Sequence, residues 1–490
     1  MSIETNASGE TKYAHGHRWQ ALIVVCLGVL MIVLDSTVVN VALPSIRDDL
    51  GFSDAALAWV VNAYLLTFGG FMLLGGRLGD LFGHRRLFLI GITLFTLASL
   101  ACGLANSQAF LVAARAIQGF GGAVVTAVAL SLIMMLFTET AERAKAMGVY
   151  SFVCAGGGSI GVLLGGLLTS ALNWHWIFLI NIPIGAVVFL LSRNLLPASH
   201  NAPESRELDV AGAVTVTVSL MLAVYAIVNG NEVGWLTART LGMLAVSAVL
   251  LGAFLWIEAR VRVPLMPLRL FASRNVSTAN VIGVLWAAGM FSWFFLSALY
   301  MQLVLGYGPM QVGLAFLPAN LIMAAFSLGL SAKLVMRFGI RVPLAGGLIL
   351  ATAGLMLFAQ APVGGNFVAH VLPGMLLLGL GAGMAFNPVL LAAMSDVPAD
   401  ESGLASGVVN TAFMMGGALG LAVLASLASA RTSSALAGGA DQLVALNDGY
   451  RVAFLVGACF AALAAILGAL LLKPAPTANP DAEVPDSPAA

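Results

Sequence analysis

The chain has 490 residues, of which 60% are hydrophobic and only 9% are charged, and its formal net charge is zero. Soluble domains carry roughly 25% charged residues, so this composition excludes an ordinary soluble protein and indicates a membrane protein with many spans. The balance of basic and acidic residues implies no nucleic acid or other polyanionic partner. The four cysteines lie within apolar runs without CxxC spacing, which favours packing roles and predicts no metal site.

Apolar runs divide the chain into fourteen predicted transmembrane helices, because a helix needs about 20 apolar residues to cross the hydrocarbon core. An all-α membrane protein is the expected class, since the only other spanning structure, a closed barrel, would show short alternating strands. The predicted spans are 19–43, 55–75, 87–105, 109–136, 146–172, 177–196, 210–229, 239–258, 276–303, 312–332, 342–361, 367–393, 403–429 and 452–472.

Two long polar connections, 193–209 and 259–275, separate groups of predicted spans. They divide the chain into two six-helix halves with two linker helices between them, and transporters are known to be built from such repeated halves. The predicted parts are a cytoplasmic N-terminus (1–18), an N-terminal half (19–196), two linker helices (210–258), a C-terminal half (276–472) and a disordered cytoplasmic tail (473–490).

Basic residues are distributed unequally between the two sides of the predicted membrane protein. Seventeen of the 22 lie in connections on the side of the N-terminus, and four lie in connections on the opposite side. The positive-inside rule therefore predicts a multi-pass protein of the cytoplasmic (inner) membrane with both termini in the cytoplasm.

The first predicted span contains a carboxylate, Asp35, within LDSTVVNVALP (34–44). A charge at the bilayer centre costs roughly 2.5–3.5 kcal/mol on insertion scales, so such a residue faces a protein interior or a water-filled cavity. The fourth span holds Arg115 within LVAARAIQGFGG (111–122), and Gln118 follows on the same helix face. Asp35 and Arg115 are therefore candidate partners. The alternative is an arginine that only holds helices together.

The connection after the second span reads GGRLGDLFGHRR (75–86), in which glycines permit tight turns and Asp80 can pair with an arginine. A conformational gate is the preferred interpretation of this loop, and an ordinary basic loop is the alternative. A weak internal repeat supports duplicated halves. At a constant offset of 256, Leu78, Phe82, Gly83 and Arg85 match Leu334, Phe338, Gly339 and Arg341.

The fifth span contains AGGGSIGVLLGG (155–166), in which Gly157, Gly161 and Gly165 recur at steps of four residues. Such a stripe of small residues predicts close packing against a neighbouring helix. The following turn, NWHWIFLINIPIG (173–185), places tryptophans at interface depth, and its histidine is interpreted as an interfacial side chain rather than a proton carrier.

Soft and aromatic side chains gather in the ninth and thirteenth predicted spans, where they could accept lipophilic substrates. The alternative is that most of them face lipid or pack between helices. Asp35 is the only acid well inside a predicted span. The candidate residues of a substrate cavity are Trp286, Phe291 and Phe413 among the aromatic side chains, and Asn40, Asn62, Tyr64 and Gln118 among the polar ones.

Taken in order, these stretches resemble the major facilitator superfamily, and in particular its 14-span drug:proton antiporter branch. LDSTVVNVALP resembles the helix 1 motif of that branch, and GGRLGDLFGHRR resembles the loop 2–3 motif of the superfamily. LVAARAIQGFGG resembles the helix 4 proton-coupling motif, and NWHWIFLINIPIG the helix 5–6 motif. The resemblance implies proton coupling by Asp35 and Arg115, and a conformational gate formed by Gly76, Asp80, Gly83, Arg85 and Arg86.

One departure concerns the helix 5 antiporter motif, in which Gly161 is followed by Val162 where the family has proline. A kink is therefore expected to be milder or absent, and the direction of exchange stays open.

The resemblance implies a proton-driven efflux antiporter, with no cofactor and no enzymatic activity, that exports lipophilic or cationic drugs by alternating access. Its expected partners are a small lipophilic substrate, protons and membrane lipid, while a periplasmic adaptor and an outer-membrane channel stay open. Alternatives within the same fold are a narrow-substrate metabolite or antibiotic exporter and a proton-coupled importer. An enzyme is disfavoured because HExxH and Walker patterns are missing from the sequence, and duplicated halves suit alternating access better than a channel.

Overall fold

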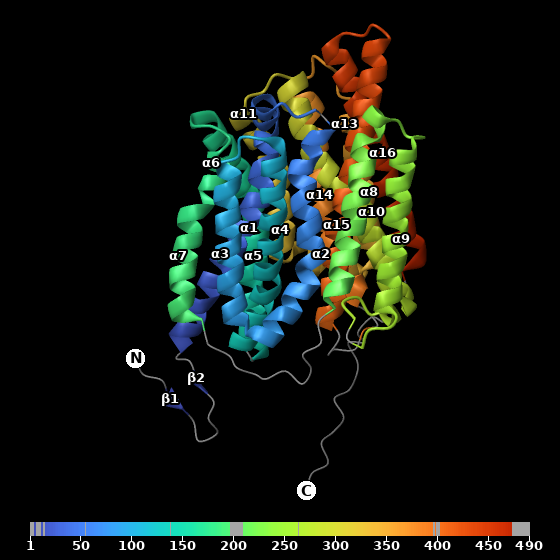
Figure 1. Ribbon diagram of the computed structural model, residues 1–490. Coiled ribbons are helices and arrows are strands. Elements are labelled where there is room, and N and C mark those ends of the chain that lie inside the picture. Colours follow the sequence, from blue (N-terminus) through green and yellow to red (C-terminus); the bar gives the residue numbers. More distant parts are fainter. Residues whose placement is uncertain are drawn as a thin grey trace.

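The computed structural model describes residues 4–5, 11–12, 15–53, 55–137, 139–196, 209–262, 264–394, 397 and 402–472. Long helices run side by side through almost all of this part of the chain (Figure 1). A two-stranded antiparallel ladder, β1 (Glu4–Thr5) and β2 (Thr11–Lys12), precedes the first helix.

The helices alternate with short connections. They are α1 (His15–Leu50), α2 (Trp59–Phe82), α3 (His84–Gly103), α4 (Gln108–Leu136), α5 (Thr140–Ala171), α6 (Trp176–Leu179), α7 (Asn181–Leu195), α8 (Val210–Val233), α9 (Ala238–Glu258), α10 (Arg274–Leu299), α11 (Pro309–Ala325), α12 (Ser331–Phe338), α13 (Arg341–Ala359), α14 (Leu372–Met394), α15 (Ser402–Ala437) and α16 (Gln442–Leu471). Short 3₁₀ turns occur at η1 (Ala56–Ala58) and η2 (Leu268–Ala272), and π-helical turns at η3 (Tyr300–Val304), η4 (Phe326–Leu330) and η5 (Phe367–Val371).

The predicted all-α membrane fold is confirmed, and each predicted span coincides with a helical segment. Twelve helices of the described chain are long and apolar enough to cross a membrane. The fifth and tenth predicted spans are represented by shorter apolar stretches, Ile160–Ala171 and Pro309–Ala325. The tenth span is interrupted because η4 contains Gly329 at φ 123°, a backbone conformation that favours glycine.

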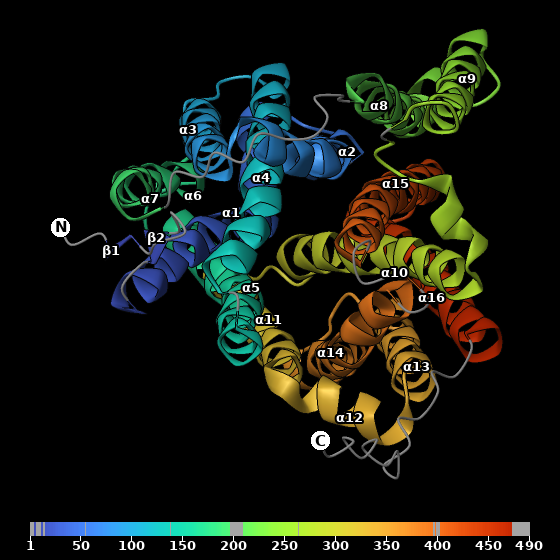
Figure 2. The same cartoon turned by 90° about the horizontal axis from the view of Figure 1, so that it is seen from below.

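The helices form two groups with a separate pair beside them (Figure 2). Helices α1 to α7 lie on one side and α10 to α16 on the other, and the groups meet where α5 packs against α11 and α2 against α15. The pair α8 and α9 lies apart, and α8 contacts both α2 and α15. The halves are therefore joined directly and also through α8.

The weak sequence repeat is also present in the backbone. Gly83 lies between α2 and α3 at φ 90°, and Gly339 lies between α12 and α13 at φ 72°. Residues with a Cβ rarely adopt positive φ, so glycine is favoured at both corners. The two sharp turns thus occupy matching places in the two halves.

The glycine stripe of α5 packs closely against α1. A side chain at Gly157 would begin 3.0 Å from Leu30 Cδ1, one at Gly161 would begin 3.0 Å from the Leu34 carbonyl oxygen, and one at Gly165 would begin 2.6 Å from the Val38 carbonyl oxygen. Glycine therefore lets the two backbones approach without a clash.

Val162 lies on another face of α5 and is buried, and its carbonyl oxygen is 2.9 Å from where a side chain at Gly313 of α11 would begin. Because α5 has no internal proline, it continues as one α-helix from Thr140 to Ala171.

Replacing Gly165 with alanine should destabilise the protein, because the new methyl group would lie 2.6 Å from the Val38 carbonyl oxygen. The expected cost is about 1–3 kcal/mol, measured by thermal unfolding in detergent micelles. Gly158→Ala is the matched control on the same helix, since nothing lies within 4 Å of its new methyl group. Equal melting temperatures for the two variants would contradict the packing role of the stripe.

Candidate functional site

Asp35 of α1 lies in the interior of the N-terminal half and is only 1% exposed. Its Oδ2 accepts a hydrogen bond from Arg115 Nη1 of α4 at 2.5 Å. Its Oδ1 accepts from Gln118 Nε2 at 2.7 Å and from Asn181 Nδ2 of α7 at 2.9 Å. The carboxylate is thus compensated by one positive charge and two neutral donors from other helices.

Arg115 is as deeply buried as its partner, with 1% of its surface exposed. Its Nε donates to the Val60 carbonyl oxygen of α2 at 2.9 Å, and Nη1 also donates to Gln118 Oε1 at 2.7 Å. The guanidinium lies 4.4 Å from the Tyr64 ring centroid and 5.6 Å from that of Phe178. These aromatic faces attract the cation in a site that excludes water.

Ser99 of α3 extends the network and was not identified from the sequence. Its hydroxyl accepts from Gln118 Nε2 at 3.1 Å and from Asn181 Nδ2 at 2.8 Å, and it donates to the Phe178 carbonyl oxygen at 3.0 Å. Asn181 belongs to the stretch 173–185 but was not among the predicted site residues. A polar amide inside that apolar run was the available signal.

Protonation of Asp35 would change the net charge of this network. As long as Asp35 is ionised, its two oxygens hold donors from α4 and α7 in place. Protonation removes the negative charge and leaves the Arg115 charge buried without a counter-ion, which is costly in a dry interior. The network joins side chains of helices α1, α3, α4 and α7, so these are the helices whose contacts depend on the charge of Asp35.

The other polar candidates for a substrate cavity, Tyr64, Asn62 and Asn40, have different surroundings. Tyr64 contacts Arg115 through its ring, while its buried hydroxyl has no hydrogen-bond partner within the described ranges. Asn62 is fully buried, and neither its amide nitrogen nor its amide oxygen has a partner in the part of the chain that the structure describes. Asn40 is 8% exposed and forms long bonds to the Ser36 and Thr37 carbonyl oxygens of its own helix, at 3.5 and 3.4 Å. Asn62 and the Tyr64 hydroxyl are therefore the polar candidates with atoms that have no partner among the described residues.

The predicted gate residues cluster at the corner between α2 and α3. Gly83 forms the corner, Gly76 lies about two turns before it in α2, and Arg86 is exposed at the start of α3. Arg85 donates through Nη2 to the Arg193 carbonyl oxygen near the end of α7. Asp80 belongs to α2, and its side chain lies outside the described residues. The described contacts tie this corner to α7 of the same half.

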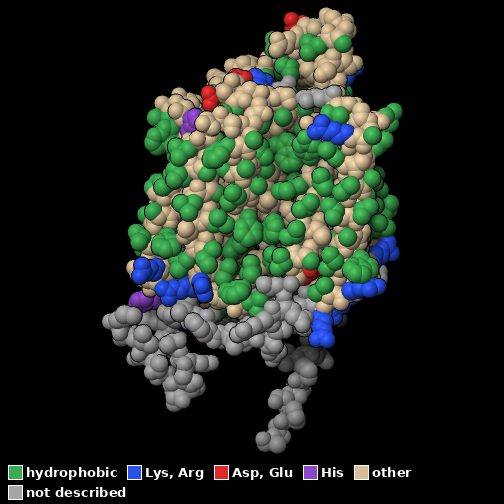
Figure 3. Space-filling view, in the orientation of Figure 1, with side chains coloured by type: hydrophobic (Ala, Val, Ile, Leu, Met, Phe, Trp, Pro, Cys, Tyr) green, Lys and Arg blue, Asp and Glu red, His purple; other side chains and the backbone are tan. Residues whose placement is uncertain are grey.

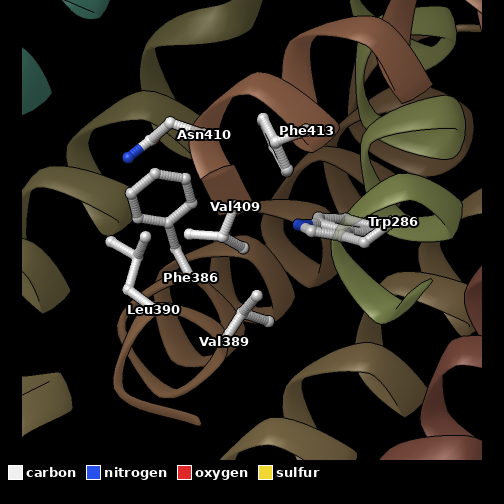
Figure 4. A pocket seen from close by; sticks show the side chains of 7 residues that line it. All are labelled: Trp286, Phe386, Val389, Leu390, Val409, Asn410 and Phe413. Carbon is white, nitrogen blue, oxygen red and sulfur yellow. The ribbon is translucent and has the colours of Figure 1, made fainter. Parts of the chain in front are cut away.

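The aromatic candidates of the C-terminal half surround a small pocket between α10, α14 and α15 (Figure 4). Trp286 and Phe413 line it, and Phe291 packs against Phe413 with ring centroids 5.8 Å apart. Trp286 Nε1 is buried, and no described residue forms a hydrogen bond with it. The lining residues are Trp286, Phe386, Val389, Leu390, Val409, Asn410 and Phe413, of which sequence reasoning identified two.

The candidates therefore form two groups rather than one cavity. Tyr64 and Gln118 contact the Asp35–Arg115 pair, whereas Trp286 and Phe413 line the pocket of the other half. The pocket has a cavity volume of only about 10 Å³, room for about one water molecule, whereas sites for drug-sized ligands are far larger. Admission of a large molecule there requires movement of the surrounding helices.

The family assignment follows from comparison with known proteins. The profile described as Major Facilitator Superfamily matches residues 25–421, and the chain belongs to this family of multi-pass membrane transporters. The membership predicted from the motifs is confirmed.

Three related proteins are efflux or resistance proteins. The chain is 39% identical to the puromycin resistance protein pur8 of Streptomyces alboniger, over 93% of this chain and 90% of that protein. It is 39% identical to the cephamycin export protein CmcT of Amycolatopsis lactamdurans, over 84% of this chain and 85% of that protein. It is 37% identical to the multidrug resistance protein Stp of Mycobacterium tuberculosis, over 85% of this chain and 76% of that protein.

Solved structures support the fold alone. A bacterial homologue of the lysosomal transporter Spinster, in an inward-facing conformation, superposes with a TM-score of 0.66 at 16% identity and covers 94% of this chain and 98% of that chain. An auto-inhibited peptide transporter of the POT family gives the same TM-score at 17% identity and covers 92% of this chain and 96% of that chain.

Replacing Arg115 with methionine should destabilise the protein by about 3–5 kcal/mol, because Asp35 would then be a buried charge without a counter-ion. Adding Asp35→Asn should recover a large part of this loss, since the uncompensated charge is removed. Thermal unfolding of the single and double variants measures the coupling.

Arg431→Met serves as the control for this experiment. Arg431 forms an ion pair with Asp448 at 2.9 Å, but its side chain is 49% exposed, so the expected loss is only about 0–1 kcal/mol. Similar losses for both arginine variants, or no recovery in the double variant, would contradict the proposed energetic role of the buried pair.

Proposed function

We propose that the chain is a proton-coupled antiporter that exports lipophilic or cationic drugs across the cytoplasmic membrane. The observation that carries this proposal is the buried network in which Asp35 binds Arg115, Gln118 and Asn181. Carboxylates inside membrane proteins commonly mark proton relays, and protonation of Asp35 would change the charge of the whole network. Protons, a small-molecule cargo and lipid are the partners that the mechanism requires.

Movement of α1 offers a path from the proton site to the other half. Val41 lies on α1 a little less than two turns after Asp35, and its carbonyl oxygen accepts a hydrogen bond from Gln302 Nε2 of the C-terminal half at 2.9 Å. Protonation of Asp35 releases the donors on α4 and α7 and so alters the position that α1 prefers. That change biases the equilibrium between two arrangements of the halves.

The membrane potential supplies enough energy for this cycle. One proton moving down roughly 150 mV releases about 3.5 kcal/mol, which supports a concentration ratio of a few hundred-fold for the exported compound. No further cofactor is needed in the proposed mechanism.

In the proposed orientation, the α2–α3 connection and the α9–α10 connection lie on the same side of the membrane. We place the corner at Gly83, with Arg85 and Arg86, and the segment holding Arg260 and Arg262 on the cytoplasmic side. In support, most visible Lys and Arg side chains gather at one end of the molecule, below the green apolar band in the view of Figure 3. Both termini then lie in the cytoplasm.

The named relatives support export and raise a second candidate function. One relative is a multidrug resistance protein, whereas another is a cephamycin export protein and a third confers puromycin resistance. An exporter with a narrow range, acting on one antibiotic, is therefore the alternative. Transport assays with a panel of unrelated drugs distinguish the two, because a narrow exporter moves one chemical family only.

The pocket between α10, α14 and α15 is the proposed substrate contact of the C-terminal half. Its lining is aromatic and aliphatic apart from Asn410, and the unpartnered Trp286 Nε1 offers one hydrogen-bond donor. Such a surface fits a lipophilic molecule that carries a hydrogen-bond acceptor.

Asp35→Asn should abolish export driven by a pH gradient, because the variant cannot exchange a proton at this site. Inverted membrane vesicles with an acidic interior and a panel of lipophilic cations and neutral drugs provide the assay, with drug uptake and proton release recorded together. Asp48→Asn is the control, since Asp48 lies at the exposed end of α1 and pairs with its neighbour Arg47. Wild-type export with an unchanged pH dependence in Asp35→Asn would refute the coupling role.

Trp286→Phe should raise the KM for substrates that accept a hydrogen bond by roughly 2- to 12-fold, the equivalent of one lost hydrogen bond. Substrates without an acceptor should be unaffected. Trp293→Phe is the matched control, because Trp293 is also fully buried on α10 with an unpartnered Nε1 but does not line the pocket. Equal effects of both substitutions would indicate a packing role instead.

A further inference from the structure

Two buried carboxyl groups meet where the linker helices α8 and α9 come together. Asp209 directly precedes α8 and is 4% exposed, and Glu258 is the last residue of α9 and is 3% exposed. Neither belongs to the Asp35 network, and the proposed transport function does not use them.

Each side chain has one oxygen with a partner and one without. Asp209 Oδ1 accepts from the Gly212 backbone N–H at 2.7 Å, and Glu258 Oε2 accepts from the Met266 backbone N–H at 2.9 Å. Asp209 Oδ2 and Glu258 Oε1 are buried, and neither has a hydrogen-bond partner among the described residues.

The two unpartnered oxygens point to the same place. Asp209 Oδ2 lies 2.3 Å, and Glu258 Oε1 2.9 Å, from the point where a side chain at Gly212 would begin. They are therefore no farther apart than these two distances combined. Two ionised carboxylates cannot stay so close in a buried site without a cation or a shared proton.

The surroundings offer no described cation. Arg260 stacks over Trp256 at 4.5 Å with an exposed side chain, and the side chains of Arg262 and Arg269 are exposed as well. Towards α2 and the segment after α9, the contacts of α8 are apolar and include Leu74, Ala213 and Leu265. The side chains of Arg77 and Asp80 on α2 lie outside the description, and the only charged side chain on the described part of α15 is Arg431, at the opposite end of that helix.

We propose that Asp209 and Glu258 share one proton and form a second proton-binding site, which fastens the linker helices together. The proton resides on Glu258 Oε1, which donates to Asp209 Oδ2. Glu258 lies at the C-terminus of α9, where the helix dipole disfavours a negative charge, and Asp209 lies at the N-terminus of α8, where the dipole favours one. With this one hydrogen every oxygen of the pair has a partner, which explains the geometry.

Loss of the shared proton in alkaline solution places two negative charges in the same buried site. The pair then separates and the junction of α8 and α9 opens. Because α8 packs against α2 of one half and α15 of the other, the change reaches both halves. The linker helices thereby acquire a response to pH that does not depend on Asp35.

The test is the pH dependence of thermal unfolding in detergent for the full chain. Ordinary carboxyl groups lose their protons near pH 4, so above this range the folded pair holds one proton more than the unfolded chain. Stability must therefore fall as pH rises, and the unfolding constant should increase about tenfold per pH unit until the shared proton leaves. Asp209→Asn and Glu258→Gln should each remove this contribution, because an amide N–H replaces the shared hydrogen without loss of the backbone contact.

Asp441→Asn is the matched control. Asp441 also caps a helix, α16, by accepting from the Leu443 backbone N–H at 2.9 Å, but no buried carboxylate adjoins it. This variant should keep the wild-type pH dependence. The proposal is wrong if Asp209→Asn and Glu258→Gln also keep it.

A bound cation is the competing explanation, and salt distinguishes it. If sodium or magnesium chloride restores stability at alkaline pH in the wild type but not in Glu258→Gln, the pair binds a cation and the proposal is overturned. Infrared spectroscopy of the wild type gives a second measurement. A protonated carboxyl band that is present at neutral pH and missing in either single variant supports the shared proton, and its presence in both variants contradicts it.

Discussion

The buried ion pair between Asp35 and Arg115 is the interaction on which the N-terminal half depends. Each residue is only 1% exposed, so neither charge can be compensated by water and both must find partners within the bundle. Those partners come from separate helices: Gln118 shares α4 with Arg115, Asn181 lies on α7 and the Val60 carbonyl group lies on α2. Displacing any of these helices leaves a buried polar group unpaired, so one network fixes several helices at once.

The two halves have similar backbone arrangements but contain different groups of functional side chains. Gly83 and Gly339 form equivalent corners, yet the C-terminal half has no described counterpart of the Asp35–Arg115 pair and instead contains the apolar pocket around Trp286. An apolar pocket recognises shape and lipophilicity and tolerates varied molecules. In the proposed mechanism, the charged network of the other half changes its protonation state without altering the lining of this pocket.

The sequence predicted most of the fold, because apolar runs of sufficient length must be helical in lipid. It also identified Asp35, Arg115 and Gln118, since burying each of these polar groups in an apolar run costs free energy. Ser99 was not identified, because a hydroxyl group costs little free energy in an apolar run. Its importance depends on which helices are its neighbours. The same holds for Asp209 and Glu258, which lie 49 positions apart at the ends of predicted spans and reveal their contact only in three dimensions.

The linker helix α8 limits how the halves can move. It approaches α2 closely where Thr217 Cβ lies 3.1 Å from the point at which a side chain at Gly70 would begin. It binds α15 through Asn231 Nδ2, which donates to the Ser426 carbonyl oxygen at 2.7 Å. Directional hydrogen bonds resist sliding more than a van der Waals contact with glycine does. A rocking motion is therefore expected to carry α8 with α15 while α2 slides past it, so the Asp209–Glu258 junction travels with the C-terminal half.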